Sequence, residues 1–281
     1  MKKEVKRRTP PGWAVTLIWV AGIFLIWEIG AFIVGGSLRT PENTLPHIWQ
    51  IIASVFDPSP VSNRMSAILI VLTSAGETLL RALLGFLIGS AAGFLLALLM
   101  KLSGIVEKLL FPYLMLIQMI PILGMAPIIL SITGDIGISR IVIAAILTFY
   151  PVAANTLAGF HSVSTEKTEL MYSYASNRKN LYGKVLIPSA IPYFFTGLKI
   201  AAPMAITASI LVDTLQGDGG MGCMLSQSLR HAMSIYVFWQ IILLAAAVGI
   251  LSSYLMGVIE NYVSPIKRVE RRMEKEAKNN D

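Results

Sequence analysis

Acidic and basic side chains are scarce in this sequence, and two long runs contain none. Asp, Glu, Lys and Arg make up 14% of the 281 residues, whereas about 25% is typical of a soluble domain. The runs Leu109–Thr133 (25 residues) and Ala232–Ile259 (28 residues) carry no charge. Each is longer than the ~20 apolar residues that a membrane-spanning helix needs, and neither alternates as a barrel strand would. We therefore predict an all-α polytopic membrane protein.

Other absences narrow the chemistry that the chain can perform. Cys223 is the single cysteine, so no intrachain disulfide can form and no C-x-x-C metal or redox spacing exists. The histidines, His47, His161 and His231, are far apart and lack metal-binding spacing. The sequence has no G-x-x-x-x-G-K-[ST] loop, which is the usual cradle for a nucleotide. With no nucleophile–base pattern either, we predict no catalytic residue, no metal and no cofactor in this chain.

Six membrane spans fit the hydropathy pattern best. We place the start of the second span at Glu77 and treat the apolar segment Ala67–Leu72 as a candidate interfacial helix. Residues 1–76 then hold an N-terminal tail, the first span and an external loop, residues 77–262 the core, and residues 263–281 a charged tail. The predicted spans are Trp13–Gly35, Glu77–Met100, Leu109–Thr133, Ile141–Phe160, Pro192–Val212 and Tyr236–Tyr262.

The positions of Lys and Arg predict an orientation in the membrane. With the N-terminus inside, 17 of the 23 cations lie in the inner segments. This bias places both termini in the cytoplasm of a multi-pass protein of the cell membrane, and it explains the net charge of +7 without a nucleic-acid partner. The other six cations are four in outer loops and two inside spans: Arg39, Arg64, Arg140 and Arg230, then Arg81 and Lys199.

Segment 161–188, between the fourth and fifth spans, is cytoplasmic in this orientation and unusually polar. Ser164 or Thr165 can cap a first helix. Asn180 can cap a second short helix, which should end near Ile187 because Pro188 disfavours helix there. The few cations of segment 161–188 are grouped in the turn and do not line one helix face. This arrangement favours docking into a groove on a partner protein over lying on the lipid surface. We predict a helix–turn–helix on the cytoplasmic face.

This segment resembles the cytoplasmic EAA loop of binding-protein-dependent ABC transporter permeases, in which E-A-A-x-x-x-G is followed by I-x-L-P. Glu169 falls on the glutamate and Ala175 on the glycine. Leu170 and Met171 replace the two alanines, and Val185–Pro188 falls on I-x-L-P. Because alanine resists the positive φ that glycine allows, we expect either a shallower bend at Ala175 or a different groove on the partner.

Two further stretches resemble the sulfonate, nitrate, taurine and thiamine-precursor subgroup of this family. They are "TLLRALLGFLIGSAAG" (Thr78–Gly93) and "IPYFFTGLKIA" (Ile191–Ala201). The likeness extends over about Glu77 to Tyr262. It implies the fold of a type I ABC importer permease and the transport of a small organic or oxyanionic nutrient.

The resemblance also implies partners, because in this family the loop forms a coupling helix that sits in a cleft of a separate ATPase. The expected partners are an ABC ATPase subunit that binds the ATP, an extracytoplasmic substrate-binding protein and a second permease copy in a homodimer. The implied ATPase-coupling residues are Glu169, Leu170, Met171, Tyr172, Tyr174, Ala175, Ser176, Asn177 and Arg178.

An autonomous secondary transporter or channel is the rival hypothesis. It would use buried charges for ion coupling and often shows inverted repeats. We find no clear repeat between the two halves of the sequence. An intramembrane enzyme would need paired catalytic groups at matched depth, and none are evident. We therefore predict the permease subunit of an ATP-driven importer, which is not itself an enzyme.

Polar side chains inside the spans are candidates for the translocation path. Gln118 and Asn155 could instead bond to a neighbouring helix. Glu77 and Arg81 are spaced to pair along one helix, and Lys199 is expected to snorkel towards the cytoplasm. The residues predicted for the path are Gln118, Asn155 and Asp213.

Glycine and proline positions add local predictions. Residues 217–222 match G-x-G-x-x-G but follow a span instead of a strand, so we predict a flexible external turn and no dinucleotide site. Pro121 and Pro127 are expected to interrupt the third span and Pro151 the fourth. One face of the second span is predicted to pack closely against another helix because it carries three glycines: Gly85, Gly89 and Gly93.

Overall fold

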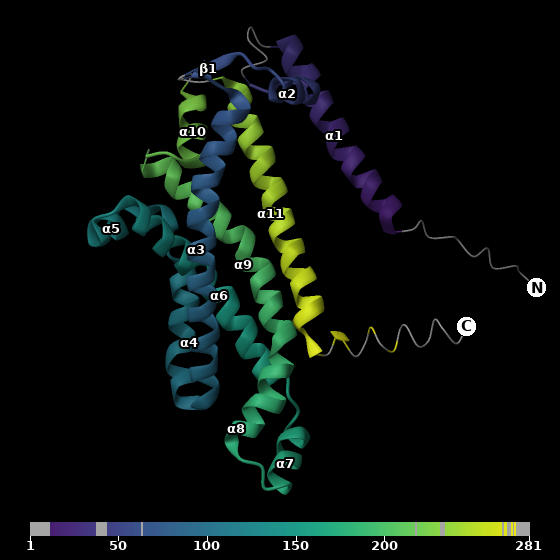
Figure 1. Cartoon of the computed structure of the whole chain (residues 1–281), viewed down its shortest axis with the longest axis vertical. Helices are drawn as coiled ribbons and strands as arrows, with labels where there is room; N and C mark the ends of the chain where they lie inside the picture. The colour runs from purple at the N-terminus through teal and green to yellow at the C-terminus, as the bar shows by residue number, and fades with distance from the viewer. Residues whose placement is uncertain are drawn as a thin grey trace, which may run out of the picture. The chain divides into compact units, whose positions relative to one another are not determined.

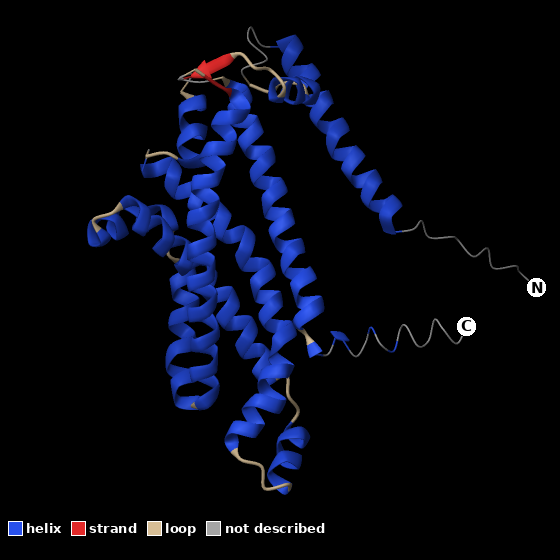
Figure 2. Cartoon of the chain, viewed as in Figure 1, coloured by secondary structure: helices blue, strands red, loops and turns tan. Residues whose placement is uncertain are grey.

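The computed structural model describes residues 12–37, 44–62, 64–216, 218–230, 234–265, 267, 268, 271 and 273. Residues 1–11 of the predicted N-terminal tail, most of the C-terminal tail, Arg39 and His231 lie outside this part of the chain. Figure 2 shows that helices dominate the described part and that one short hairpin supplies its strands. The first elements are α1 (Gly12–Ser37), α2 (Ile48–Val55), β1 (Pro60–Ser62), β2 (Met65–Ser66), α3 (Ala67–Leu102), α4 (Gly104–Met119) and α5 (Ile122–Thr133). They are followed by α6 (Ile136–His161), α7 (Thr165–Ser173), α8 (Arg178–Leu181), the π-helical turn η2 (Tyr182–Leu186), α9 (Ile187–Gln216), α10 (Gly220–Leu229) and α11 (Ile235–Val263).

The predicted number of six spans is reached if the third is a bent pair of helices. In the described part of the chain, five helices are long and apolar enough to cross a membrane, and α4 with α5, bent by 109°, makes a sixth if the pair counts as one span. The break falls at Pro121, and Ile120 before it is extended, as a residue preceding proline prefers. The prediction that Pro127 and Pro151 interrupt their spans is wrong, because each lies inside a helix without ending it.

Four spans begin five or more residues before their predicted starts; the third begins at Gly104 and the fifth at Ile187, each five residues early. The second span begins at Ala67 and not at Glu77, since α3 runs unbroken over 36 residues and takes in the candidate interfacial helix. The fourth begins at Ile136, because Asp135 caps α6 by accepting a hydrogen bond from the Ile138 amide at 2.7 Å. Arg140 therefore lies inside a span, and its assignment to an outer loop is wrong.

The chain divides into two compact units, and each is described by itself. Unit 1 comprises residues 1–70 and 228–240. Within it, Glu28 of α1 accepts hydrogen bonds from the Ile48 amide at 2.9 Å and lies 2.6 Å from His47 Nδ1. Trp27 donates its indole N–H to the Pro46 carbonyl at 3.1 Å and packs edge-on against Trp239. These contacts pair the in-span carboxylate Glu28 and join α1 to the start of α2.

Unit 2 comprises residues 71–227 and 241–281 and contains the main core. Helix α6 packs along α9, and α3 covers them from one side (Figure 1). The predicted glycine face is confirmed as a packing face. A Cβ added at Gly85 would lie 2.5 Å from Ala144 Cβ, and one at Gly93 would lie 2.6 Å from the Phe149 carbonyl oxygen. Glycine is required on this face because α3 and α6 approach backbone to backbone.

Gly89 provides a test of this packing. A Cβ there would overlap the Thr148 hydroxyl and lie 2.5 Å from the Ala145 carbonyl oxygen. Gly89→Ala should therefore lower the free energy of unfolding by about 1–3 kcal/mol through overpacking. Gly76 is the matched control in the same helix, because nothing lies within 4 Å of its added Cβ. Gly76→Ala should stabilise by up to about 1 kcal/mol. Thermal midpoints in detergent check both, and equal shifts would contradict the close approach.

Candidate functional site

A helical protrusion stands at one end of unit 2. It comprises α7, a four-residue turn (174–177) and α8, and it leads through η2 into α9 (Figure 1). The helix–turn–helix predicted for segment 161–188 is thus present. The protrusion joins α9 at Ile187. The distance along α9 from Ile187 to Asp213 is about 39 Å, because 26 residues of helix separate them. The protrusion and Asp213 therefore belong to opposite ends of this unit.

The turn after α7 is a Schellman motif with alanine in the position that glycine usually takes. The Ser176 amide donates to the Met171 carbonyl at 3.0 Å, and the Ala175 amide donates to the Tyr172 carbonyl at 2.9 Å. Ala175 has a φ of 48°, in the left-handed region. The expectation of a shallower bend at Ala175 is wrong. This geometry gives hydrogen bonds to two backbone carbonyls of the last helical turn. Their free energy outweighs the cost of about 1–2 kcal/mol that a non-glycine residue incurs at positive φ.

The second helix of the protrusion differs from the prediction at both ends. Asn177, and not Asn180, is its cap, because the Asn177 side chain accepts a hydrogen bond from the Asn180 amide at 2.9 Å. The helix also continues through Pro188. The Ile187 amide donates to the Tyr182 carbonyl, five residues back, so the wider π turn keeps the backbone paired just before the proline that cannot donate. Ser164 occupies the cap position of α7 without a side-chain hydrogen bond.

The outer surface of the protrusion carries apolar side chains that the fold does not use. Leu170, Tyr172 and Tyr174 are 57%, 60% and 77% exposed. Beside them Glu169, Asn177 and Arg178 are exposed, and α7 has no buried residue among those described. Met171 is different, since it packs inward with Leu181 and Leu186. A short helix that is held against the core by one side chain and exposes aromatic side chains on its other face is suited to insertion into a groove on a partner.

The base of the protrusion is tied to α3 and α4 by polar contacts that the sequence did not indicate. Tyr182 donates its hydroxyl to the Lys101 carbonyl at 3.2 Å. His161, at the end of α6, lies 3.0 Å from Glu107 through Nε2 and 3.4 Å from Lys101 Nζ through Nδ1. These groups are more than 50 positions apart in the sequence, so neither periodicity nor local spacing could have joined them. These contacts join η2 to α3, and the end of α6 to α3 and α4.

A buried ionic network lies at the other end of unit 2. Asp213 of α9 and Arg140 of α6 have no exposed side-chain surface, and Arg140 Nε lies 3.0 Å from Asp213 Oδ1. Arg81 of α3 lies 3.7 Å from the same oxygen and 3.9 Å from Glu77 Oε2, so the predicted Glu77–Arg81 pairing is confirmed at the edge of this network. Thr78 donates its hydroxyl to Asp213 Oδ2 at 2.6 Å. One carboxylate therefore joins three helices.

The glycine-rich turn at 217–222 is docked onto this network. Gly219 and Gly220 have φ values of 71° and 83°, and a Cβ at Gly220 would overlap the Asp213 carboxylate. The Met221 amide donates to Thr78 Oγ1 at 2.8 Å, and Arg140 donates to the Asp218 carbonyl at 2.9 Å. The prediction of a flexible turn is wrong for the described residues here, because α10 starts at Gly220 and the Met221 side chain is fully buried.

The three residues predicted for a translocation path occupy different surroundings. Gln118 is exposed near the end of α4. Asn155 donates its side-chain amide to the Pro151 carbonyl of its own helix at 2.7 Å. Asp213 is buried in the ionic network. Among the hydrogen bonds and ion pairs described for these residues, none joins one of the three to another.

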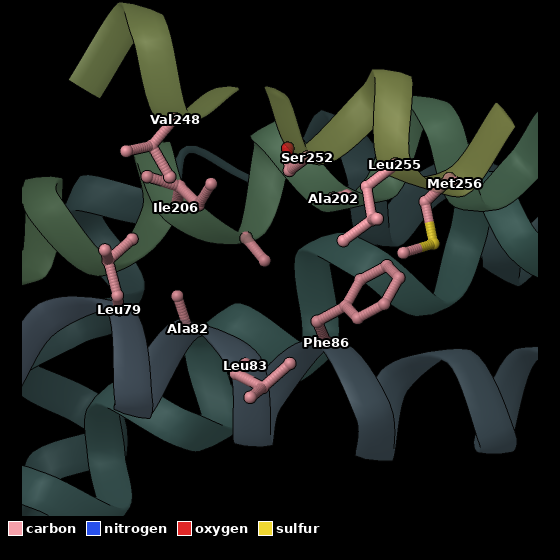
Figure 3. Close-up of a pocket in the computed structure, with 11 residues that line it drawn as sticks. Leu79, Ala82, Leu83, Phe86, Ala202, Ile206, Val248, Ser252, Leu255 and Met256 are labelled. Carbon is pink, nitrogen blue, oxygen red and sulfur yellow. The ribbon is translucent and has the colours of Figure 1, made fainter. Parts of the chain in front are cut away.

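An apolar pocket of about 260 Å³ lies between α3, α9 and α11 (Figure 3). In Figure 3 the Phe86 ring of α3 extends towards Met256 of α11. The hydroxyl of Ser252 donates to the Gly249 carbonyl at 2.8 Å and so is already used. A polar or anionic solute would find no free donor here and would lose its hydration, so this pocket does not suit one. Its lining residues are Leu79, Ala82, Leu83, Phe86, Ala202, Ala205, Ile206, Val248, Ser252, Leu255 and Met256.

Comparison with known proteins identifies what this architecture resembles. Residues 85–265 match the family model described as "Binding-protein-dependent transport system inner membrane component". The formylaminopyrimidine transport permease protein ThiX of Halalkalibacterium halodurans is 28% identical, with 88% of this chain and 93% of that protein covered. The nitrate import permease protein NrtB of Synechococcus elongatus is 28% identical, with 71% of each covered. The putative aliphatic sulfonates transport permease protein SsuC of Bacillus subtilis is 26% identical, with 92% of this chain and 89% of that protein covered.

Solved structures share the fold at lower sequence identity. A crystal structure titled as an amino acid ABC transporter with histidines has a TM-score of 0.59 at 20% identity, over 69% of this chain and 94% of the other. An inward-facing conformation of the MetNI methionine ABC transporter has a TM-score of 0.62 at 16% identity, over 70% of this chain and 97% of the other. The fold is that of type I ABC importer permeases.

Proposed function

The chain belongs to the family of binding-protein-dependent transport system inner membrane components, and from this premise we propose how it works as the permease subunit of an ABC importer. The protrusion α7–α8 docks into a separate ATPase subunit, which binds the ATP. ATP-driven closure of that partner moves α8 and thereby α9. The chain itself supplies the path and no nucleotide chemistry, in keeping with the lack of a G-x-x-x-x-G-K-[ST] loop in its sequence.

The exposed apolar surface of α7 is the observation that carries the proposal. Tyr172 and Tyr174 lie outside the core, yet the backbone between them and α8 is fixed by the Schellman turn at Ala175. A rigid, exposed aromatic pair is a poor solvent-facing surface and a good anchor for a groove. Glu169, Ser176, Asn177 and Arg178 would form the polar rim of the contact.

The same proposal sets the orientation and the partners. A soluble ATPase places the protrusion in the cytoplasm, which agrees with the excess of Lys and Arg in segments on that side. Both termini are then cytoplasmic, and the Asp213 network faces the side where a substrate-binding protein would dock. A homodimer would create a path at its two-fold axis, since six spans enclose little by themselves.

The substrate class is proposed from the relatives. Their names give formylaminopyrimidine, nitrate and aliphatic sulfonates as transported compounds. We propose a small organic or oxyanionic nutrient for this chain, passing polar groups that include Gln118, Asn155 and Asp213 as candidates. The apolar pocket of Figure 3 is outside this route, because it offers such a solute no free donor.

Co-purification tests the proposal directly. The tagged full chain, extracted from native membranes in detergent, should bring down a soluble protein with a G-x-x-x-x-G-K-[ST] loop. A variant with Leu170→Asp and Tyr174→Asp should lose that partner, because two carboxylates would be desolvated in the groove. Lys108→Asp, at an exposed position of α4, is the control for added negative charge. Recovery of the chain without an ATPase, under conditions that preserve a known importer complex, would favour an autonomous transporter.

A further inference from the structure

A second charged cluster in unit 2 belongs neither to the protrusion nor to the Asp213 network. Glu260, near the end of α11, is 2% exposed, and its carboxylate pairs with two ammonium groups. Lys199 of α9 pairs with Oε2, and Lys267 lies 2.7 Å from Oε1. Two cations on one carboxylate leave a net charge of +1. Both lysine side chains are partly exposed, and an ammonium group has three donors, so each retains donors beyond the one directed at Glu260.

A surface groove of about 500 Å³ runs from these lysines along α11. The stem of Lys199 passes beside Gly257, where an added Cβ would be in ordinary van der Waals contact with Lys199 Cε at 3.4 Å. Further along the groove, Tyr254 and Ile250 are 69% and 74% exposed and lie one turn apart. The groove is lined by Lys199, Ile250, Ser253, Tyr254, Gly257, Val258, Asn261 and Lys267.

The length of the groove matches one leaflet of a bilayer. Ten residues of helix separate Ile250 from Glu260, which is about 15 Å. Half of a ~30 Å hydrocarbon core is the same length. The cations lie at the end of the span, where headgroups are found, and the apolar stripe of Tyr254 and Ile250 leads towards its middle.

We propose that this groove binds an anionic phospholipid, with its phosphate between Lys199 and Lys267 and one acyl chain along Tyr254 and Ile250. Charge complementarity identifies the headgroup, since basic pockets between membrane helices bind anionic lipids. Glu260 positions the two ammonium groups and is itself shielded from the phosphate by them. A second copy of the chain fits this groove less well, because the centre of a protein interface is depleted in lysine.

Lipid titration of the purified full chain tests the site. Native mass spectrometry in detergent would follow binding of phosphatidylglycerol and of phosphatidylcholine with identical acyl chains. The anionic lipid should bind more tightly. Lys267→Gln, which removes the partly exposed cation of the cluster on the C-terminal side, should weaken phosphatidylglycerol binding about fivefold and leave phosphatidylcholine binding unchanged. Lys108→Gln, which removes the same charge from an exposed position on α4, should change neither.

Four results would overturn the proposal. The first is equal binding of the two lipids by the unaltered chain, and the second is phosphatidylglycerol binding by Lys267→Gln that is as tight as that of the unaltered chain. The third is displacement of the lipid by millimolar inorganic phosphate. The fourth is loss of the dimer in Lys267→Gln when no lipid is bound. The third would assign the lysines to a soluble anion, and the fourth would assign the groove to a second copy. None of these outcomes depends on an ATPase, so the test is separate from that of the coupling protrusion.

Discussion

Replacing both Tyr172 and Tyr174 by alanine is expected to reduce substrate-stimulated ATP hydrolysis by the assembled transporter at least about tenfold. Aromatic anchors at an interface commonly contribute about 2 kcal/mol or more each, which is a factor of about 30 in affinity. The two rings are 60% and 77% exposed, so their removal should leave the chain folded and inserted. The measurement is ATPase activity in proteoliposomes with the binding protein and its substrate, set against the amount of chain in the membrane.

Tyr113→Ala is the matched control for this pair. Tyr113 is 58% exposed on α4, outside the protrusion, so its loss removes one ring of similar exposure from a position that the proposal does not place in the contact. The control should retain full activity. If Tyr113→Ala and the double variant lost activity equally, or if the double variant stayed fully active, the protrusion would not be the contact with the ATPase.

The membrane-spanning architecture could be predicted because hydropathy and length act locally. The uncharged run 109–133 lies within the bent pair α4–α5, and residues 235–259 of the second run lie within α11. The effect of individual prolines could not be predicted in the same way. Pro121 breaks a span, whereas Pro127 and Pro151 lie inside helices. A proline removes one donor in each case, and the outcome depends on whether neighbouring helices satisfy the freed carbonyl, which is a property of the tertiary structure.

The polarity of segment 161–188 predicted its helix–turn–helix, but not the conformation of its turn. The rule that alanine avoids positive φ is a statement about one residue, and it cannot weigh that cost against two backbone hydrogen bonds. Ala175 adopts a φ of 48° because the Schellman turn satisfies the end of α7. Ala175 therefore occupies a left-handed backbone position that glycine usually takes.

The partner of Asp213 was the most important residue that the sequence analysis misplaced. Arg140 and Asp213 are 73 positions apart, and only the packing of α6 against α9 joins them. One local signal was available. Asp135 directly precedes an apolar run and can act as a helix cap, which would have put Arg140 inside the fourth span. An arginine inside a span needs a partner, and Asp213 was the carboxylate already named as a candidate for the path.

Asp213→Asn is expected to destabilise the chain by about 3–5 kcal/mol, because it leaves the fully buried Arg140 without its counter-charge. Arg140→Met alone should cost a similar amount by leaving Asp213 uncompensated. The double variant, Asp213→Asn with Arg140→Met, should recover most of the loss. Asparagine retains an oxygen that can accept the Thr78 hydrogen bond, and methionine fills the space of the arginine stem without a charge. Thermal midpoints in detergent, compared across the three variants, measure the coupling between the two sites.

The double variant also separates a structural role from a role in transport. A pair that only joins α6 to α9 can be replaced by an uncharged pair, so uptake should return together with stability. A pair whose charge meets the substrate or the binding protein cannot be replaced in this way. The double variant would then be as stable as the unaltered chain and still fail to transport. Arg81 lies 3.7 Å from Asp213 and remains partly exposed. Arg81→Gln should therefore cost far less stability than Asp213→Asn or Arg140→Met. An equal loss of stability would contradict the assignment of Arg140 as the main partner of Asp213.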